Sequence, residues 1–409
     1  MSATNTPQLY GSVSKTFHWL TAALILTLIP LGIYANDLPY DSSEALAYKA
    51  WFFSLHKTLG VAVFFVALAR IVWALSQPKP APLHPDRKLE TFAAATVHWL
   101  LYGSLVIVPL SGWIHHASTA GFAPIWWPLG QDLPLVPKSE SLAATTAGLH
   151  IVFERVLAVS IFLHLAGALK HHFVDRDATL RRMLPGHAET ATTDTPGHKT
   201  RPILAALAVW AVAVGIGALL GTYEKHDTGV QAAALEAVQS DWAVQEGTLE
   251  ITVSQLGAPV TGSFADWTAA IRFDETRDSG TVGSVDVVIS IGSLTLGSVT
   301  REALGADFFN VEGFPTANFN AEILRDATGY AAVGTLTIKD ESLPLTLPFT
   351  LDVNEGLAVM EAQTQIDRRH YKIGASQTDP ASLGFNVDVS IQLTAQDESQ
   401  SSRGAQGGT

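Results

Sequence analysis

Two histidines in one long apolar segment could bind a metal at two depths of a membrane. His150 and His164 both fall in the run LHIVFERVLAVSIFLHLAGALKHHF. At about 3.6 residues and 5.4 Å per helical turn, they would share one helix face about 21 Å apart. Ionisable groups inside a bilayer are costly and usually functional. The spacing indicates two stacked haems, each bound by one of these histidines and one from another helix. The segment alone leaves open a pair of interfacial or packing histidines.

The composition indicates a protein that is at least partly embedded in a membrane. The chain has 409 residues, 47% of them hydrophobic, and its long apolar runs stop near residue 222. Such a chain cannot be a single soluble domain. The absence of cysteine excludes disulfides, thiolate metal sites and a catalytic thiol, so histidine must supply any soft ligand.

The charge is concentrated in the C-terminal part. Residues 241–395 hold 21 acidic and 8 basic side chains, which accounts for the whole net charge of −13. The N-terminal part is balanced. This distribution argues against nucleic acid as a partner.

Five apolar runs are long enough to span a bilayer, and they cover residues 17–34, 51–75, 92–116, 149–173 and 202–220. The first run lacks a small-residue cleavage pattern, so we expect a transmembrane helix rather than a removed signal peptide. Basic residues gather in the second-to-third and fourth-to-fifth loops. The positive-inside rule then places the N-terminus and both basic loops in the cytoplasm and the C-terminal part in the periplasm.

This topology sorts four histidines into two levels. His18 near the start of the first helix and His164 near the end of the fourth would lie at the inner side, and His56 and His150 at the outer side. Packing histidines have no reason to match in depth. The pattern therefore favours two haems with paired histidine ligands.

The motifs around these histidines resemble the bacterial cytochrome b561 family of four-helix dihaem proteins. The resemblance covers roughly residues 10–186 and rests on FHWL, LHK-x-LG, GLH and the closing LH-x6-HH-F-x3-D-x-TLRRMLP. It implies haem b, with axial ligands at the matching positions His18, His56, His150 and His164. It also implies electron exchange with the quinone pool, and some members are taken to oxidise superoxide and reduce ubiquinone.

Other polar residues have two interpretations each. Arg70 could neutralise a propionate of the inner haem, because guanidinium suits bidentate carboxylate contact, or it could be a positive-inside anchor. Lys57 and Arg155 could do likewise at the outer haem, although Arg155 could simply pair with Glu154. His98 is either a proton carrier or quinone contact, or a packed histidine. Four other histidines lie at the ends of predicted helices, where a histidine at the membrane interface needs no special role. A contact with a haem propionate or a quinone is the alternative for these residues, which are His115, His116, His171 and His172.

Beyond residue 240 the hydrophobic period changes from 3.6 to 2. Leu249, Ile251 and Val253 alternate with polar residues, and so do the residues of LPLTLPFTLDV and of Phe385–Ile391. This pattern predicts an antiparallel barrel or sandwich of about 150 residues. A barrel with apolar inward positions can enclose an elongated apolar ligand. A fully packed barrel without a cavity is the alternative.

Residues 241–395 resemble the YceI-like family of lipocalin-like periplasmic barrels that bind a long isoprenoid chain. The matching elements are GSF-x2-W-x4-RFD, SVDVVISIGSL, DFFNVEGFPTANF and GTLTIKD followed by LPLTLPFTL. The resemblance implies a lipid-lining role for Phe308, Phe309, Phe314 and Phe319, any of which could instead be core.

We therefore expect an all-α four-helix dihaem membrane bundle with one extra transmembrane helix, followed by an all-β antiparallel lipocalin-like barrel. The expected boundaries are 1–186 for the bundle, 187–240 for two linkers around a fifth helix at about 202–221, 241–395 for the barrel and 396–409 for a disordered tail.

The function that follows is inner-membrane electron transfer, an oxidoreductase hypothesis. Two haem b groups would exchange electrons between the quinone pool, with ubiquinone as a candidate, and a periplasmic donor or acceptor such as superoxide. The barrel would bind an isoprenoid or quinone-like lipid. The alternative is a membrane-anchored isoprenoid-binding or stress protein whose helices serve mainly as an anchor. The oligomeric state, including a homo-oligomer, stays open.

Overall fold

The computed structural model describes residues 2–128, 130–186, 200–224 and 232–398. Their contacts divide the chain into a helical unit and a β unit.

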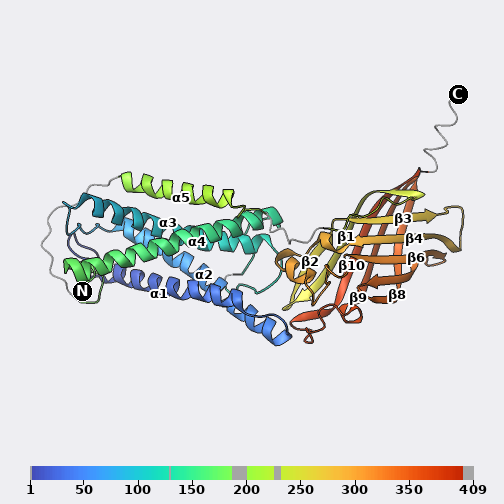
Figure 1. Ribbon diagram of the computed structural model, residues 1–409, viewed down its shortest axis with the longest axis horizontal. Helices are drawn as coiled ribbons and strands as arrows, with labels where there is room; N and C mark the ends of the chain where they lie inside the picture. The colour runs from blue at the N-terminus through green and yellow to red at the C-terminus, as the bar shows by residue number, and fades with distance from the viewer. Residues whose placement is uncertain (1, 129, 187–199, 225–231, 399–409) are drawn as a thin grey trace, which may run out of the picture. The chain divides into compact units, whose positions relative to one another are not determined.

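Five long helices make up the helical unit (Figure 1). They are α1 (Ser12–Asp37), α2 (Ser43–Ser76), α3 (Lys88–Ser118), α4 (Glu140–Lys170) and α5 (Arg201–Leu219), and a π-helical turn, His171–Asp175, continues α4. All five are long and apolar enough to cross a membrane. This result confirms the five predicted spans, and α5 begins and ends within two residues of its predicted bounds.

The first four helices share one apolar core. Each contributes buried side chains to it, among them Ile25 and Leu28 from α1, Val63 from α2, Leu105 from α3 and Leu157 from α4. Helix α5 packs on the outside of α3 and α4, where the Trp210 indole donates a hydrogen bond to the Ser104 hydroxyl at 3.4 Å. The helical unit is thus a four-helix bundle with an added fifth helix.

The β unit is a curled antiparallel sheet of ten strands in the order β3-β4-β6-β7-β8-β9-β10-β1-β2-β5 (Figure 1). The curl brings the first strand of this order, β3, close to the start of β1. There the Asp241 amide, just before β1, donates a hydrogen bond to the Ile271 carbonyl on β3 at 2.9 Å. The strands are β1 (Trp242–Gln255), β2 (Ala258–Phe264), β3 (Trp267–Phe273), β4 (Gly280–Ser290), β5 (Leu294–Thr295), β6 (Thr316–Asp326), β7 (Gly329–Ile338), β8 (Glu341–Asn354), β9 (Leu357–Asp367) and β10 (Leu383–Asp397).

The register of the sheet explains the alternating sequence. Leu249 pairs with Ile391, and Val253 pairs with Val387, so apolar side chains of β1 and β10 face the same interior. Both Leu249 and Val253 are buried, whereas the intervening Glu250 is exposed. A one-residue slip would turn all of these side chains outward, so burial fixes the register.

One buried cation organises the loop between β9 and β10. The Arg368 side chain is 2% exposed, and its guanidinium donates to five backbone carbonyls. The acceptors are the carbonyl oxygens of Gly384, Ile373, Gly374, Gln377 and Leu383, at 2.6–3.0 Å. Periodicity gave no sign of this buried arginine.

Strand β10 continues to Asp397, two residues beyond the predicted end of the barrel. The remainder of the predicted disordered tail, from residue 399 on, lies outside the described residues. So do 187–199 and 225–231 within the two predicted linkers.

Candidate functional site

The first histidine pair meets between α1 and α4. The ring centroids of His18 and His164 lie 6.0 Å apart, and the ring planes are inclined by 55°. A metal bound to two imidazole nitrogens at about 2 Å each would separate the ring centroids by roughly 6 Å. The observed separation therefore leaves space for one metal between the rings.

Two further polar side chains border this pair. Arg70 of α2 places Nη2 3.3 Å from His18 Nδ1, and its guanidinium also lies over the Tyr102 ring. The His98 ring of α3 lies edge-on to His164 with centroids 5.1 Å apart, and its Nδ1 donates to the Ala94 carbonyl at 2.6 Å. His98 thus contacts the pair and is also hydrogen-bonded within its own helix.

At the other level, His56 and His150 each donate a hydrogen bond to a backbone carbonyl on a neighbouring helix. His56 Nδ1 lies 3.1 Å from the Leu28 oxygen on α1, and His150 Nδ1 lies 2.8 Å from the Val108 oxygen on α3. A carbonyl only accepts, so Nδ1 carries the proton in both rings. This fixes the tautomer that leaves Nε2 as a metal ligand, as is usual for metal-binding histidines.

Glycines make room for both of these rings. A Cβ at Gly32 of α1 would lie 2.8 Å from His56 Cε1, and a Cβ at Gly112 of α3 would lie 2.9 Å from His150 Nδ1. Atoms cannot approach so closely without displacement. Two glycines on two helices thus cradle one imidazole each, and the residues present fit a haem with paired histidine ligands.

Among the remaining candidates, Lys57 and Arg155 lie near the middle of α2 and α4, and His115 and His116 lie near the end of α3. Lys57 is buried beside His56. His115 donates from Nδ1 to the Ala143 carbonyl at 2.9 Å, and its ring contacts that of His116. Arg155 is 73% exposed and lies 3.3 Å from Glu154, so its local ion pair is formed.

The β unit contains two apolar cavities in its interior. The first, of about 150 Å³, is lined by apolar side chains alone, including Trp242, Trp267 and Ala332. The second has about 210 Å³. Leu249, Ile289 and Leu336 line both, so the cavities adjoin each other inside the sheet. An interior of this kind suits an elongated apolar ligand.

The four phenylalanines that were predicted to line a lipid cavity lie in different places in the structure. Phe308 and Phe309 line the larger interior cavity, and Phe319 lines the smaller one. Phe314 is not among the described residues that line either cavity. Sequence reasoning missed the other lining residues, such as Trp267 and Ile289, because alternation identifies inward positions without showing where space remains.

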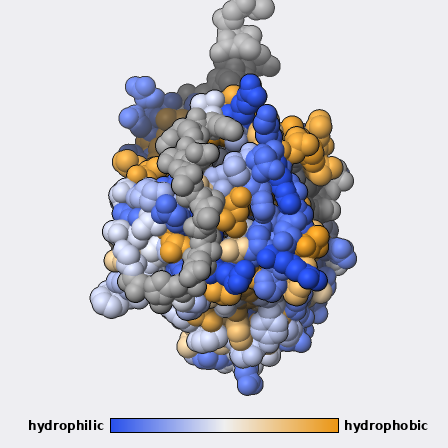
Figure 2. All heavy atoms as spheres, turned by 90° about the vertical axis from the view of Figure 1, so that its left-hand side faces the viewer, coloured by the Kyte–Doolittle hydropathy of each residue, from blue (hydrophilic) through white to orange (hydrophobic). Residues whose placement is uncertain are grey.

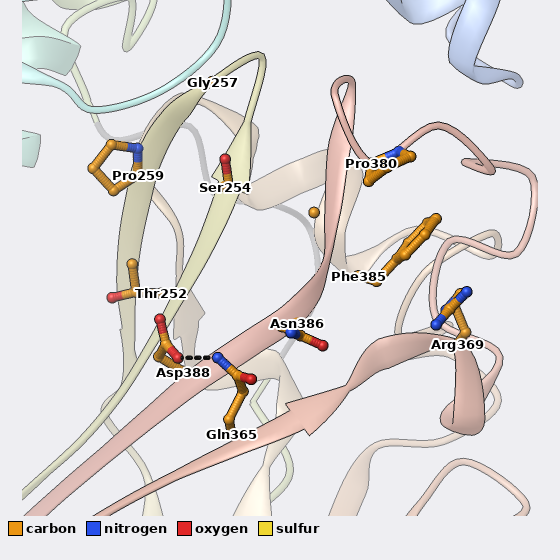
Figure 3. Close-up of a pocket in the computed structure, with 11 residues that line it drawn as sticks. Thr252, Ser254, Gly257, Pro259, Gln365, Arg369, Pro380, Phe385, Asn386 and Asp388 are labelled. Carbon is orange, nitrogen blue, oxygen red and sulfur yellow. Dashed lines mark hydrogen bonds between the residues drawn. The ribbon is translucent and has the colours of Figure 1, made fainter.

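A third cavity, of about 590 Å³, lies on the polar outer side of β1, β2, β9 and β10 (Figure 3). Gln365 donates to Asp388 across it at 2.8 Å, and the Arg369 guanidinium lies 3.9 Å from the centre of the Phe385 ring. It is an open polar groove rather than an enclosure for an apolar molecule.

Fold and site together define a class: a membrane protein with paired histidines inside a four-helix core and an apolar-lined β-barrel on the same chain. The chain belongs to the prokaryotic cytochrome b561 family, whose family model matches residues 9–186, and it carries a YceI-like domain at residues 242–395. Both predicted resemblances are confirmed.

Curated relatives match each part separately. Cytochrome b561 homolog 2 of Escherichia coli K12 is 34% identical over 192 residues, 45% of this chain and 95% of the relative. Probable superoxide oxidase CybB of Yersinia pestis is 25% identical over 177 residues, 43% of this chain and 96% of the relative. A UPF0312 protein of Yersinia pestis strain Pestoides F is 30% identical over 171 residues, 38% of this chain and 87% of the relative.

Two conclusions follow from family and fold. Membership of the cytochrome b561 family implies haem b as a cofactor. The five candidate spans and the family identify a bacterial inner-membrane protein.

Proposed function

We propose that the chain is a dihaem b cytochrome. His18 and His164 would hold one haem, and His56 and His150 the other. The observation that carries this proposal is the 6.0 Å separation of the His18 and His164 rings, which come from opposite ends of the bundle sequence. In the second pair, both rings donate a hydrogen bond from Nδ1 to a backbone carbonyl. This leaves Nε2 of each ring free of a proton and supports metal ligation through Nε2.

The bound haems would supply one-electron transfer, and the protein would set their positions and potentials. The carbonyls of Leu28 and Val108 hold the His56 and His150 rings in a fixed orientation. Hydrogen bonds of this kind raise the basicity of the ligand. His18 lies in the second turn of α1, whereas His56 lies well inside α2, and the proposal assigns the two pairs to different levels of the bundle from the order of the helices.

Arg70 has a more specific part in the proposal. Arginine only donates, so in the Arg70 contact His18 Nδ1 must accept. A neutral imidazole bound to iron through Nε2 carries its proton on Nδ1 and cannot accept there. Arg70 would therefore turn from His18 to a carboxylate, for which a haem propionate is the proposed partner.

We propose the quinone pool as one electron partner and a periplasmic reductant, with superoxide as the leading candidate, as the other. The similarity to a probable superoxide oxidase of Yersinia pestis supports this choice. Two superoxide anions would each lose one electron to give oxygen, and one ubiquinone would take both electrons with two protons. The basic loops that support a cytoplasmic N-terminus also support a periplasmic barrel.

We propose that the barrel binds an isoprenoid or quinone-like lipid. The wholly apolar lining of the smaller cavity supports this, because it offers no polar group to a water molecule or a polar ligand. A quinone has both a redox head and an isoprenoid tail, so a single ligand could relate the two parts of the chain.

The alternative function is lipid binding by a barrel that the helices merely anchor. One transmembrane helix would be enough for an anchor, whereas all four bundle helices here carry either one of these histidines or a glycine that packs against one. This arrangement favours electron transfer.

Superoxide oxidation is tested with the purified full chain in detergent. Enzymatically generated superoxide is supplied with a short-chain ubiquinone, and ubiquinol formation and haem reduction are followed. The proposal predicts superoxide-dependent ubiquinol that is lost in the His56→Ala variant. Haems that superoxide does not reduce, or that ubiquinone does not reoxidise, would refute the proposed partners while leaving the haem assignment intact.

Lipid binding is tested by extraction and mass spectrometry of the same preparation. Ala332 is buried on β7 and lines the smaller cavity, whereas its neighbour Val333 points to the outside. Ala332→Phe should lose the co-purifying isoprenoid lipid, and Val333→Phe should keep it. Equal lipid content in both variants would contradict an interior binding site.

A further inference from the structure

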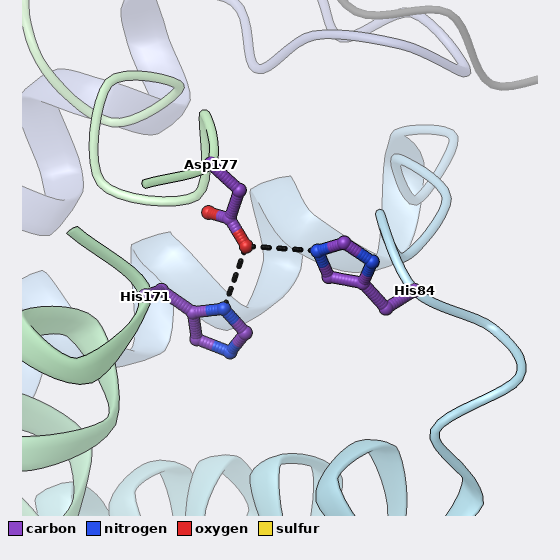
Figure 4. Close-up of side chains that lie close together, drawn as sticks. All are labelled: His84, His171 and Asp177. Carbon is purple, nitrogen blue, oxygen red and sulfur yellow. Dashed lines mark hydrogen bonds and ion pairs between the residues drawn. The ribbon is translucent and has the colours of Figure 1, made fainter. Parts of the chain in front are cut away.

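A compact group of ligand-type side chains lies at the end of the bundle that holds the N-terminus (Figure 4). His84 comes from the loop between α2 and α3, His171 opens the π-helical turn after α4, and Asp177 follows that turn. Asp177 Oδ2 lies 3.1 Å from His84 Nε2 and 2.7 Å from His171 Nδ1. The two imidazole planes are parallel within 5°.

The local backbone brings these groups together. Arg176 has a left-handed conformation with φ of 53°, which reverses the chain directly after the π-helical turn. The Asp177 amide then donates to the His171 carbonyl at 3.1 Å. Asp177 therefore points back at the last turn of the helix, where the loop bearing His84 also arrives.

Asp177 makes its direct ion pairs with imidazoles. Its side chain is 11% exposed, and within the described part of the chain its ion-pair partners are the two histidines. Arg87 and Lys170 nearby both pair with Asp175 instead. Arg182 interacts with Asp177 electrostatically, but its guanidinium donates to backbone carbonyls and does not pair with the carboxylate directly.

Asp177 stays ionised over the whole physiological range. Burial opposes its charge, but hydrogen bonds from the side chain and amide of Thr179 and from His171 outweigh burial and lower its pKa to about 2. A carboxylate must be deprotonated to bind a metal. Asp177 is therefore available as a ligand at neutral pH.

The distances between the ligand atoms match those around one small ion. Two ligands at the tetrahedral angle on a metal with bonds of about 2.0–2.1 Å lie roughly 3.3 Å apart, so the ligand atoms here would move slightly apart on binding. The two histidine-to-carboxylate distances are 3.1 and 2.7 Å, and all three ligand atoms lie within 4.8 Å of one another. Two imidazoles and one carboxylate suit Zn²⁺ and other divalent first-row metals.

We propose that His84, His171 and Asp177 form a binding site for a divalent first-row transition metal, with Zn²⁺ as its probe. Three protein ligands leave a further position on the metal for water. His84 is about one-third exposed, which gives the ion a path of entry. Hydrophilic residues are prominent on this end of the bundle (Figure 2), so the site would meet water rather than lipid.

The site would join two parts of the helical unit. It links the loop before α3 to the end of α4, which otherwise meet here through hydrogen bonds and ion pairs. This inference does not rest on the proposed electron transfer, because none of its three residues belongs to the proposed haem ligands.

Zinc titration of the purified full chain by isothermal calorimetry, with metal counted by mass spectrometry, tests the site. The wild type should bind one Zn²⁺ with an affinity that His84→Gln and Asp177→Asn each reduce at least tenfold. His172→Gln is the matched control, because His172 is an exposed neighbour of His171, and it should leave the affinity unchanged. Retained haem spectra in all variants show that they are folded.

A spectroscopic readout sharpens the result. X-ray absorption should show two imidazole ligands with bonds near 2.0 Å. Zinc binding that is absent, that survives both ligand variants, or that His172→Gln weakens equally would overturn the proposal.

Discussion

Gly112 on α3 lies directly against the His150 ring, so that a Cβ at position 112 would be 2.9 Å from His150 Nδ1. The same ring donates to the Val108 carbonyl, four residues earlier on α3, at 2.8 Å. One turn of α3 thus provides both the hydrogen-bond acceptor and the space for this imidazole. His150 cannot move away from an added methyl group and also keep its hydrogen bond.

Gly112→Ala should therefore disturb the haem that we propose for His56 and His150 and leave the proposed second haem intact. We expect a shifted spectrum, and a lower haem content, for one of the two haems in redox titrations. Gly215→Ala on α5 is the control, because nothing lies within 4 Å of a Cβ there. An effect of Gly112→Ala on both haems alike, or on neither, would refute this arrangement.

Arg70→Gln should lower the midpoint potential of the haem that we propose for His18 and His164. A nearby cation stabilises the reduced haem, and its loss should cost about 1 kcal/mol, on the order of 40 mV for one electron. Arg155→Gln is the matched control, because Arg155 is exposed and paired with Glu154. Spectroelectrochemical titration measures both variants. An unchanged potential in Arg70→Gln would favour the simple role of a positive-inside anchor.

Arg368→Met should loosen the loop between β9 and β10. The substitution leaves five backbone carbonyls, four of them on buried residues, without their donor, and unsatisfied buried polar groups cost about 1–3 kcal/mol each before relaxation. Hydrogen exchange measured by mass spectrometry should show faster exchange across residues 368–383. Arg301→Gln, at an exposed arginine outside this loop, should exchange much as the wild type does. Equal protection in the two variants would contradict this role.

The contribution of Asp367 to the same loop should depend on pH. Hydrogen bonds from the Arg369 side chain come first among the causes that lower the Asp367 pKa to about 2. A lowered folded-state pKa means stability that is present above the unfolded value of 3.8 and is lost as the pH falls through about 2. Asp367→Asn should thus speed local hydrogen exchange at pH 5, and the difference from the wild type should shrink towards pH 2. Asp352→Asn, at an exposed strand position, serves as the control, and a difference that does not change with pH would contradict the assignment.

The sequence was sufficient to predict the two architectures. Long uncharged runs predicted the five spanning helices, and the alternation around Leu249 and Val253 predicted the sheet and its inward face. Both signals arise from burial of a repeating face, which the order of residue types records directly.

Partners that are distant in sequence could not be predicted in the same way. The depth argument grouped His18 with His164, and the structure brings these rings together, but their role as haem ligands stays a prediction. Nothing in the local pattern indicated that His56 bonds to Leu28 or that Gly32 makes room for its ring. Helix packing creates these contacts.

The barrel shows the same limit. Arg368 looks like a surface residue in the sequence, yet it is buried, because the loop that follows it folds back and aims five backbone carbonyls at its guanidinium. His84 and Asp177 likewise belong to different loops that only the bundle brings together.

The most direct test of the central claim is the haem-to-protein ratio of the purified chain, combined with reduced-minus-oxidised spectra. Alanine is placed singly at His18, His56, His150 and His164, and at His98 as a control that contacts His164. We predict two low-spin haem b groups per wild-type chain, one lost or perturbed in each of the four variants, and both retained in His98→Ala. A wild type without haem, or haem that is indifferent to all four substitutions, would contradict the account.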